Sequence, residues 1–382
     1  MSLTISIPAT RTHRIAVSVF FFIAGFTFAS WASRIPDIKT KLLLTDAGLG
    51  AVLFALPVGL MLGLPFSGYL VARFGSRIVM IITAMLYPLT LILLGMAPSV
   101  WTLSASLFLF GFWGNLLNIS INTQAVGVEA LYGRSIMASF HGLWSLAGFT
   151  GAAVGTLMIA LHLTPFTHYC IICATAFLLV LISFKYTLPH SDSNNKQPIF
   201  ARPDASILKL GLIAFGCMVC EGTMFDWSGV YFQKEVQVSA AYTTLGYVAF
   251  MSSMAAGHFI ADWLVTKFGV KTMLQFSGTV ICIGLLTAVI FPHILPATIG
   301  FLLVGLGVSS VIPLVYGLAG KSKSMQPGVA LAAVSTIGFL GFLIGPPLIG
   351  FIAGASSLRW SFSVIALIGL GTAILAGKVK IG

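Results

Sequence analysis

The stretch GLPFSGYLVARFGSR (63–77) recurs 194 positions later as GHFIADWLVTKFGVK (257–271). The two copies share glycines, a Leu-Val pair and cations at matching places. A second pair of segments, FTFASWAS (26–33) and GTMFDWSG (222–229), lies at an offset of 196 and aligns a threonine and a tryptophan. Two ordered matches at nearly one offset indicate that the chain repeats one architecture in two similar halves.

The composition places this repeat in a membrane. Of the 382 residues, 58% are hydrophobic and only 8% are charged, whereas soluble domains carry roughly 25% charged residues. Apolar runs of about 18 residues or more recur along the chain, and each is long enough to cross about 30 Å of hydrocarbon as a helix. The alternation typical of barrel strands is absent. We therefore predict an all-α integral membrane protein with twelve transmembrane helices. The predicted spans lie near residues 14–33, 47–71, 77–96, 100–126, 135–160, 166–187, 207–232, 241–266, 272–291, 295–319, 327–353 and 358–377.

The net charge of +11 orients the chain and does not indicate a nucleic-acid partner. With the N-terminus placed inside, fifteen of the 20 Lys and Arg residues fall on the cytoplasmic side. This asymmetry follows the positive-inside rule and predicts that both termini are cytoplasmic. Arg11 and Arg14 precede a full-length apolar span that lacks a small-residue cleavage site, so we expect this span to be a transmembrane helix and not a cleaved signal.

A polar stretch, LPHSDSNNKQPIFARPDAS (188–206), divides the predicted helices six and six. We predict an N-terminal six-helix bundle over residues 1–187, a cytoplasmic linker over residues 188–206 and a C-terminal six-helix bundle over residues 207–382. The bundles would be two parallel repeats whose axis runs along the membrane normal.

The first repeated segment also resembles a known motif. GYLVARFGSR (68–77) is similar to the loop between helices 2 and 3 of the major facilitator superfamily, Gly-x-x-x-Asp-Arg-x-Gly-Arg-Arg, although Ala72 stands where the family has Asp. Within that superfamily, NTQAVGVE (122–129), SFHGLWSLAG (139–148) and EGTMFDWS (221–228) resemble a bacterial MosC-like branch, loosely associated with sugar- or cyclitol-type solutes. The resemblance implies the twelve-helix fold of that superfamily and a multi-pass carrier in the bacterial inner membrane.

The charges at the helix ends predict gating contacts. Arg73 and Arg77 are placed where cations meet helix C-termini and acidic partners, and such a contact can hold the cytoplasmic side closed. Asp262, in the aligned segment that also carries Lys267, is expected to supply a carboxylate there. The alternative is that these cations are ordinary loop charges that obey the positive-inside rule.

Two carboxylates lie in the seventh predicted span, in CEGTMFDWSGVYF (220–232). Measured from Ile207, Glu221 lies about 21 Å along the helix and Asp226 about 28 Å. A carboxylate at the depth of Glu221 costs about 2.5–3.5 kcal/mol on insertion scales, so it is expected to face protein or water. We predict that Glu221 binds substrate or a proton, with a structural hydrogen-bonding role as the alternative. Asp226 is predicted to be a structural or gating partner of Arg34, with a ligand role as its alternative.

Polar residues in the first half complete the predicted binding site. Asn115, Asn118 and Asn122 recur at i, i+3 and i+7, which places them on one side of a helix. His141 and Trp144 are three positions apart in the next span, and a histidine can exchange a proton near neutral pH. Trp227 is a candidate for stacking on a sugar-like ring. Interhelical hydrogen bonding is the alternative role for the polar members of this group.

The distribution of cations narrows the solute class. Organic anions usually require a buried cation, and no Lys or Arg lies deep in any predicted span. We therefore predict a monomeric secondary active transporter for a small neutral or cationic polar solute, with a proton as the coupling ion for uptake. The alternative is a proton-driven exporter, although its typical helix-5 motif with proline is missing from GFTGAAVG (148–155).

No enzyme activity, cofactor or metal site is predicted. The chain contains no phosphate-binding loop of the GxxxxGK[ST] type. Two CxxC pairs, CIIC (170–173) and CMVC (217–220), lie within apolar spans without nearby histidines. Their cysteines are therefore expected to be small packing residues and not metal ligands.

Overall fold

The computed structural model describes residues 9–133, 136–189, 204–322, 325 and 327–379, and every regular element in these ranges is helical. The first half contains α1 (Ala9–Ala32), α2 (Ile35–Lys41), α3 (Asp46–Leu53), α4 (Ala55–Phe74), α5 (Ser76–Met96), α6 (Val100–Tyr132), α7 (Met137–Ala160), α8 (Pro165–Ser183) and the short η1 (Phe184–Tyr186). The second half contains α9 (Ala205–Lys234), η2 (Ala240–Tyr242), α10 (Leu245–Phe268), α11 (Val270–Ile290), α12 (Ile294–Ala319), α13 (Pro327–Ala355) and α14 (Leu358–Gly377).

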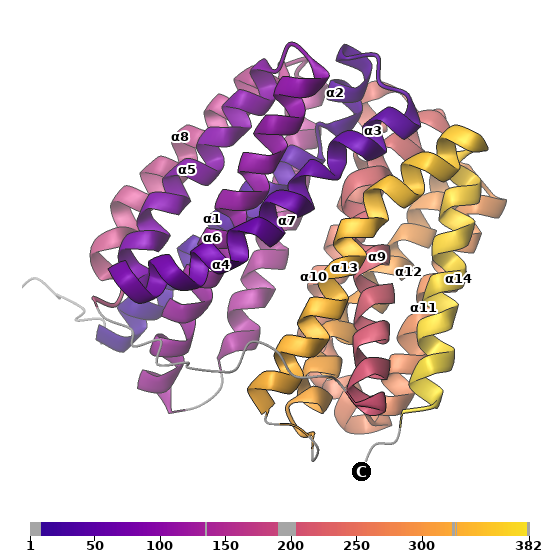
Figure 1. Ribbon diagram of the computed structural model, residues 1–382. Coiled ribbons are helices and arrows are strands. Elements are labelled where there is room, and N and C mark those ends of the chain that lie inside the picture. Colours follow the sequence, from indigo (N-terminus) through magenta and orange to yellow (C-terminus); the bar gives the residue numbers. More distant parts are fainter. Residues whose placement is uncertain (1–8, 134–135, 190–203, 323–324, 326, 380–382) are drawn as a thin grey trace, which may run out of the picture. The chain divides into compact units, whose positions relative to one another are not determined.

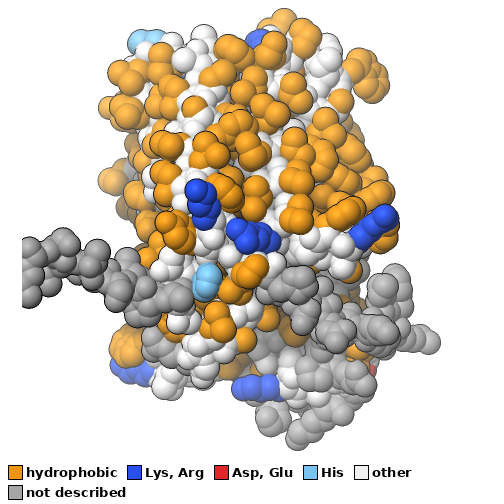
Figure 2. Space-filling model, turned by 90° about the vertical axis from the view of Figure 1, so that its left-hand side faces the viewer, with side chains coloured by type: hydrophobic (Ala, Val, Ile, Leu, Met, Phe, Trp, Pro, Cys, Tyr) orange, Lys and Arg blue, Asp and Glu red, His pale blue; other side chains and the backbone are white. Residues whose placement is uncertain are grey.

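Eleven helical stretches in the described part of the chain are long and apolar enough to cross a membrane. They coincide with eleven of the twelve predicted spans. The remaining span, 241–266, corresponds to α10, a 24-residue helix, which is about 36 Å long at 1.5 Å per residue. Figure 2 shows one face of the molecule, covered largely by hydrophobic side chains with few charged ones. Such a face suits contact with lipid and belongs to a multi-pass membrane protein.

The predicted span 47–71 is confirmed as one candidate membrane span, Asp46–Phe74, which consists of two helices. The structure has α3 and α4 in its place, separated at Phe54. Pro57 follows three residues later and lacks the N–H that would bond to the carbonyl of Leu53. The helix is therefore interrupted at Phe54, three residues before this proline.

The contacts divide the chain into two compact units. The first unit contains Met1–Trp31, Ala55–Gly151 and Leu163–Asn194, and the second contains Ala32–Phe54, Ala152–His162 and Asn195–Gly382. Two segments from the first half thus pack with the second unit. The predicted domain boundaries describe chain order and stay a prediction, and most of the predicted linker, 188–206, lies outside the described residues.

The internal repeat has a physical counterpart in each unit. In the first unit, α4 packs closely on α6, and a Cβ added to Gly111 would overlap the carbonyl oxygen of Leu56. In the second unit, α10 packs in the same way on α12, and a Cβ added to Gly305 would overlap the carbonyl oxygen of Phe250. Both pairs are related by the offset of 194 found in the sequence. The repeat therefore preserves specific helix contacts.

The glycine before α5 and its counterpart before α11 confirm the similarity at the helix junctions. Gly75 has φ 82° and ψ 148°, and Gly269 has φ 79° and ψ 156°. Side chains other than glycine rarely adopt this conformation. Each glycine therefore allows the chain to turn sharply from one long helix into the next.

Candidate functional site

Helix α9 carries both carboxylates of the predicted site. It begins after Asp204, whose side chain accepts a hydrogen bond of 2.7 Å from the backbone N–H of Ile207. It packs against α10, α12, α13, α14 and the short α2, and Figure 1 shows it beside α13. Among the eleven candidate spans, α9 is the most deeply buried. Polar groups in its middle are therefore held in a mostly apolar environment.

Glu221 lies in the middle of α9 and is half-buried. Among the described residues it forms no hydrogen bond or ion pair. It is within electrostatic range of Cys217, one helical turn earlier, and of Tyr316 on α12. Tyr316 is in turn close to Ser335 on α13. Three helices of the second unit thus bring polar groups around one unpaired carboxylate.

An aromatic cluster borders Glu221 on the next turn of α9. The ring of Phe225 stacks on Phe342 with centroids 6.3 Å apart, and it meets Phe250 edge-on at 5.7 Å. It also contacts Tyr247 at 6.3 Å. The turn of α9 that follows Glu221 is therefore packed among aromatic rings.

Asp226 and Trp227 differ in their environment. Asp226 is half-buried and forms no hydrogen bond or ion pair within the described part of the chain. Trp227 is fully buried, and neither its indole Nε1 nor the hydroxyl of Ser228 has a hydrogen-bond partner there. In this structure the Trp227 ring is enclosed by protein, so stacking on a solute would require a change in its surroundings.

The three asparagines of α6 are not equivalent. Asn115 is buried, and its Oδ1 accepts a hydrogen bond of 2.7 Å from Ser67 on α4. Asn122 donates to the Oδ1 of Asn118 at 2.7 Å, and the latter residue is exposed. Gln124 is fully buried and binds Ser76 at 2.8 Å. Asn115 and Gln124 therefore join helices, whereas the Asn118–Asn122 pair is accessible.

Helix α7 presents the other polar residues predicted for the first half. His141 is exposed, and its ring meets the edge of Phe21 at 5.6 Å. Trp144 is half-buried and lies 6.2 Å from the ring of Phe28. The predicted binding residues of this half that are accessible in the structure are thus His141, Trp144 and the Asn118–Asn122 pair.

The motif cations contact aromatic rings in both halves. Arg73 is hydrogen-bonded to the hydroxyl of Tyr69 and lies 5.3 Å from the ring of Phe74. Lys267 lies 5.3 Å from the ring of Trp263 and 5.4 Å from that of Phe268. The two sets are related by the repeat offset of 194. The cations therefore occupy equivalent settings in the two units.

The remaining predicted gating residues have separate partners. Arg77 donates to the carbonyl oxygen of Phe184 at 3.2 Å, near the C-terminal end of α8. Arg34 is buried and forms an ion pair of 2.6 Å with Asp37. The side chain of Asp262 lies outside the described part of the structure.

The sequence reading missed one charge cluster in the second unit. Asp46, at the start of α3, is buried and forms ion pairs of 2.5 Å with both Lys39 and Lys234. This cluster connects the segment after α1 to the C-terminal end of α9. Asp46 follows the helix cap Thr45, and the sequence alone identified it only as a residue at a span end. No pattern in the sequence indicated which lysines it would meet.

Within the described residues, no group of three or more His, Cys, Asp or Glu side chains is placed to hold a metal ion. The five cysteines are all free thiols, and four of them are buried. Cys217 and Cys220 direct their thiols toward backbone carbonyl oxygens of Val308 and Ile365, at 3.9 and 3.8 Å. These contacts fit packing residues.

The sequence of this chain is similar to a known family of transporters. The family model of the Major Facilitator Superfamily matches residues 15–325 and, in an overlapping match, residues 230–379. An uncharacterised MFS-type transporter of Yersinia pestis is 33% identical over 368 residues, which cover 96% of each chain. The membrane protein MosC of Rhizobium meliloti is 31% identical over 368 residues, 95% of this chain and 89% of that protein.

The fold comparison agrees with the sequence comparison. A bacterial homologue of the human lysosomal transporter Spinster, in an inward-facing and occupied conformation, superimposes with a TM-score of 0.75. The alignment covers 98% of both chains at 14% sequence identity. At this identity the likeness concerns the fold alone.

Proposed function

Because the chain belongs to the major facilitator superfamily, we propose that it is a secondary active transporter that moves a small polar solute by alternating access. We further propose proton-coupled uptake across the bacterial inner membrane, with both termini in the cytoplasm. In this proposal Glu221 binds the proton and contributes to solute binding. The 15-to-5 distribution of cations in the predicted topology supports the orientation.

The observation that carries the proposal is the unpaired state of Glu221. A half-buried carboxylate in the middle of a membrane helix that served only the fold would be expected to have a hydrogen-bonding or ionic partner. Glu221 has none among the described residues, although the hydroxyl of Tyr316 lies nearby. Low polarity favours the protonated carboxyl, and a polar solute can supply the missing hydrogen bonds. Glu221 is therefore suited to exchanging a proton as solute binds and leaves.

The polar groups support a neutral, hydroxyl-rich solute or a small cation. The first unit offers the exposed Asn118, its partner Asn122, and His141 with Trp144. The second unit offers Glu221. A further relative, a probable nitrate transporter of Staphylococcus epidermidis, is 26% identical over 371 residues, and its name refers to an anion. An anion is a poorer fit here, because every Lys and Arg of this chain lies in a loop or near a span end.

The helix-end charges are proposed to act in gating. Arg73, Arg77 and Lys267 lie at ends predicted to be cytoplasmic, where a change of partner can accompany opening and closing. Arg34 and Asp226 are proposed to act at the opposite side. The exposed setting of Arg73 on aromatic rings supports this role, because such a contact can be exchanged for an ion pair at low cost.

Proton-driven export is the competing function. A multidrug resistance protein B homologue of Mycobacterium tuberculosis is 28% identical over 144 residues, 37% of this chain. Helix α13 also contains the sequence GFLIGPPLIG (341–350), which is similar to the glycine- and proline-containing motif of antiporters. This string lies in the eleventh predicted span and not in the fifth, so uptake remains the preferred proposal.

The test is proton movement in proteoliposomes across a panel of sugars, cyclitols, polyols and amines. Solute should raise the external pH around right-side-out vesicles, and Glu221→Gln should remove this response. Glu235→Gln, an identical change at the C-terminal end of α9, is the matched control and should retain it. If no solute moves protons while a pH gradient drives cationic dyes across the membrane, uptake is refuted and export replaces it.

A further inference from the structure

A cavity lies within the first unit, between α1, the C-terminal end of α6, α7 and α8. The cavity has a volume of about 650 Å³, within the range of about 300–1,000 Å³ common for small-molecule sites. Its lining residues are Arg11, Arg14, Ile15, Ser18, Val19, Phe22, Tyr132, Leu143 and Leu179. None of these residues is acidic. The candidate proton site, Glu221, belongs to the other unit, so this cavity requires its own explanation.

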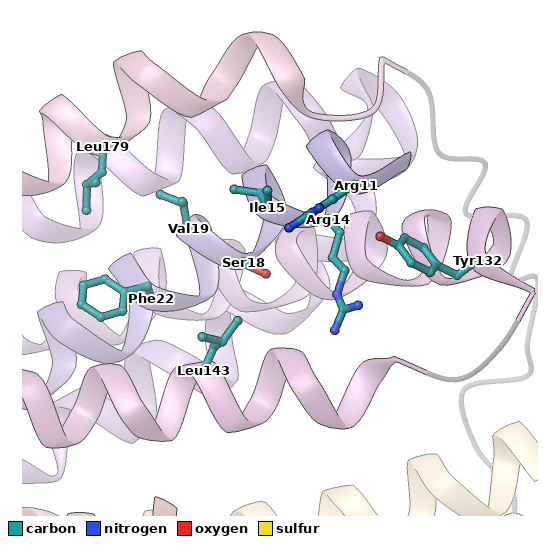
Figure 3. A pocket seen from close by; sticks show the side chains of 9 residues that line it. All are labelled: Arg11, Arg14, Ile15, Ser18, Val19, Phe22, Tyr132, Leu143 and Leu179. Carbon is teal, nitrogen blue, oxygen red and sulfur yellow. The ribbon is translucent and has the colours of Figure 1, made fainter. Parts of the chain in front are cut away.

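The polar and apolar groups are separated along the cavity. Figure 3 shows Arg11, Arg14 and Tyr132 toward one end, and Phe22 and Leu179 toward the other. From Arg11 to Phe22 the helix rises about 16 Å. The cavity is thus cationic near the start of α1, the end predicted to lie at the cytoplasmic surface, and apolar toward the membrane interior.

The two arginines have donors left for an anion. Arg14 donates to the hydroxyl of Ser139 at 3.3 Å, and its guanidinium lies 5.4 Å from the centre of the Tyr132 ring. Arg11, three positions earlier, is exposed and lies on the neighbouring part of the same helix face. Each guanidinium has five N–H donors, and this geometry suits the oxygens of a phosphate.

The apolar part distinguishes the possible ligands. Ile15 is 49% exposed, and Val19 and Phe22 continue its side of α1 toward Leu143 on α7. An inorganic phosphate would satisfy the arginines and leave this surface uncovered. An acyl chain would cover it, because each buried CH₂ group contributes favourably to binding. Cationic pockets between transmembrane helices at the cytoplasmic side suit anionic lipid head groups.

We propose that this cavity binds one anionic phospholipid of the cytoplasmic leaflet. Arg11 and Arg14 hold its phosphate, and one acyl chain lies along Ile15, Val19 and Phe22. The site selects anionic over zwitterionic lipids, because the quaternary ammonium of a zwitterionic head group would be repelled by the two guanidinium groups.

The first test measures lipid retention by native mass spectrometry of the whole purified protein. We expect one phosphatidylglycerol molecule to remain bound when phosphatidylcholine has dissociated. Replacing both arginines, Arg11→Gln with Arg14→Gln, should weaken phosphatidylglycerol binding about thirtyfold, as expected for two cations near an anionic lipid surface. Lys185→Gln, which removes an exposed cation at the end of α8 outside the cavity, should leave binding unchanged.

A second test uses the unaltered protein and so does not depend on folding of the variants. Phosphatidylglycerol with a photoreactive acyl chain should label peptides that contain Val19, Phe22 or Leu143, and excess phosphatidylcholine should not prevent labelling. Equal retention of the two lipids, or labelling only elsewhere in the chain, would overturn the proposal. Displacement of the lipid by millimolar inorganic phosphate would also overturn it and identify a free-phosphate site instead.

Discussion

Helices α1 and α9 occupy equivalent places in the internal repeat, yet they use two of their shared positions differently. Both carry a threonine and a tryptophan four residues apart, Thr27 with Trp31 and Thr223 with Trp227, and all four side chains are buried. The indole nitrogens of both tryptophans lack a hydrogen-bond partner among the described residues. The repeat thus preserves one packed face of each helix.

The difference lies at two nearby positions, one before the threonine and one between the threonine and the tryptophan. In α1, Gly25 packs so closely on α7 that an added Cβ would overlap the carbonyl oxygen of Trp144, and Ser30 donates to the carbonyl of Phe26 at 2.7 Å. The same positions in α9 hold Glu221 and Asp226, at the offset of 196. One helix uses these positions for packing, and the other carries carboxylates that have no ionic partner. Packing alone does not explain the acids of α9, and this difference is consistent with the proposed role of Glu221 in transport.

The prediction with the largest expected effect tests whether Glu221 serves transport or the stability of the fold. Glu221→Gln keeps the shape of the side chain and removes its charge. We expect solute-driven proton movement to be lost, because an amide cannot bind the proton. Solute binding should weaken about 10- to 100-fold, because a hydrogen bond to a charged group contributes about 1.5–3 kcal/mol. Thermal unfolding in detergent should shift little or to a higher temperature, since the variant no longer places a carboxyl group in an apolar interior. A lower midpoint together with normal transport would mean that Glu221 is structural.

The sequence predicted the architecture well because membrane helices are specified by long apolar runs. The repeat offset of 194 also paired Gly75 with Gly269 and Arg73 with Lys267, and the structure places each pair in equivalent settings. The aromatic rings beside the two cations were not predicted. The span 47–71 was predicted correctly, but the one-residue interruption at Phe54 within it was not, since the run of apolar residues continues through it. A hydropathy pattern reports length and polarity but does not register a missing backbone donor.

The candidate site was less predictable because its residues depend on tertiary neighbours. Helical spacing grouped Asn115 with Asn118 and Asn122, but only the structure shows that the first binds Ser67 and is buried. The spacing of residues on one helix cannot indicate what the adjacent helix presents. For the same reason no sequence pattern identified the lysines that bind Asp46, which lie seven positions before it and 188 positions after it.

Asp46 provides the converse of Glu221, because it is a buried carboxylate with two ionic partners. Asp46→Asn removes the charge that both Lys39 and Lys234 bind at 2.5 Å. We expect the free energy of unfolding to fall by about 3–4 kcal/mol, as in other buried pairs that lose one partner. Lys234→Gln is the control and should cost at most about 1 kcal/mol, since Lys234 is 47% exposed and Lys39 remains. Chemical denaturation monitored by tryptophan fluorescence would measure both changes, and equal small effects would contradict the structural role of this cluster.

Gly25 tests the packing side of the comparison. Gly25→Ala should lower the free energy of unfolding by about 3 kcal/mol, because the new methyl group meets backbone atoms of α7 that cannot move independently. Gly68→Ala is the matched control, since an added Cβ there meets no atom within 4 Å, and it should have little effect on thermal stability. If both variants were equally stable, α1 and α7 would not be held as closely as the structure indicates.

The smallest expected losses in the free energy of unfolding should be equal in the two halves. Gly75→Ala and Gly269→Ala each force alanine into a conformation that is strained for any residue with a Cβ, with φ near 80° in both cases. Neither position has an atom within 4 Å of an added Cβ, so the cost is conformational alone, about 2 kcal/mol at each site. The double variant should lose the sum of the two values, because the sites share no partner. Unequal losses would show that the junctions before α5 and α11 contribute differently to stability despite their matching backbone angles. The difference between the halves would then extend beyond the carboxylates of α9.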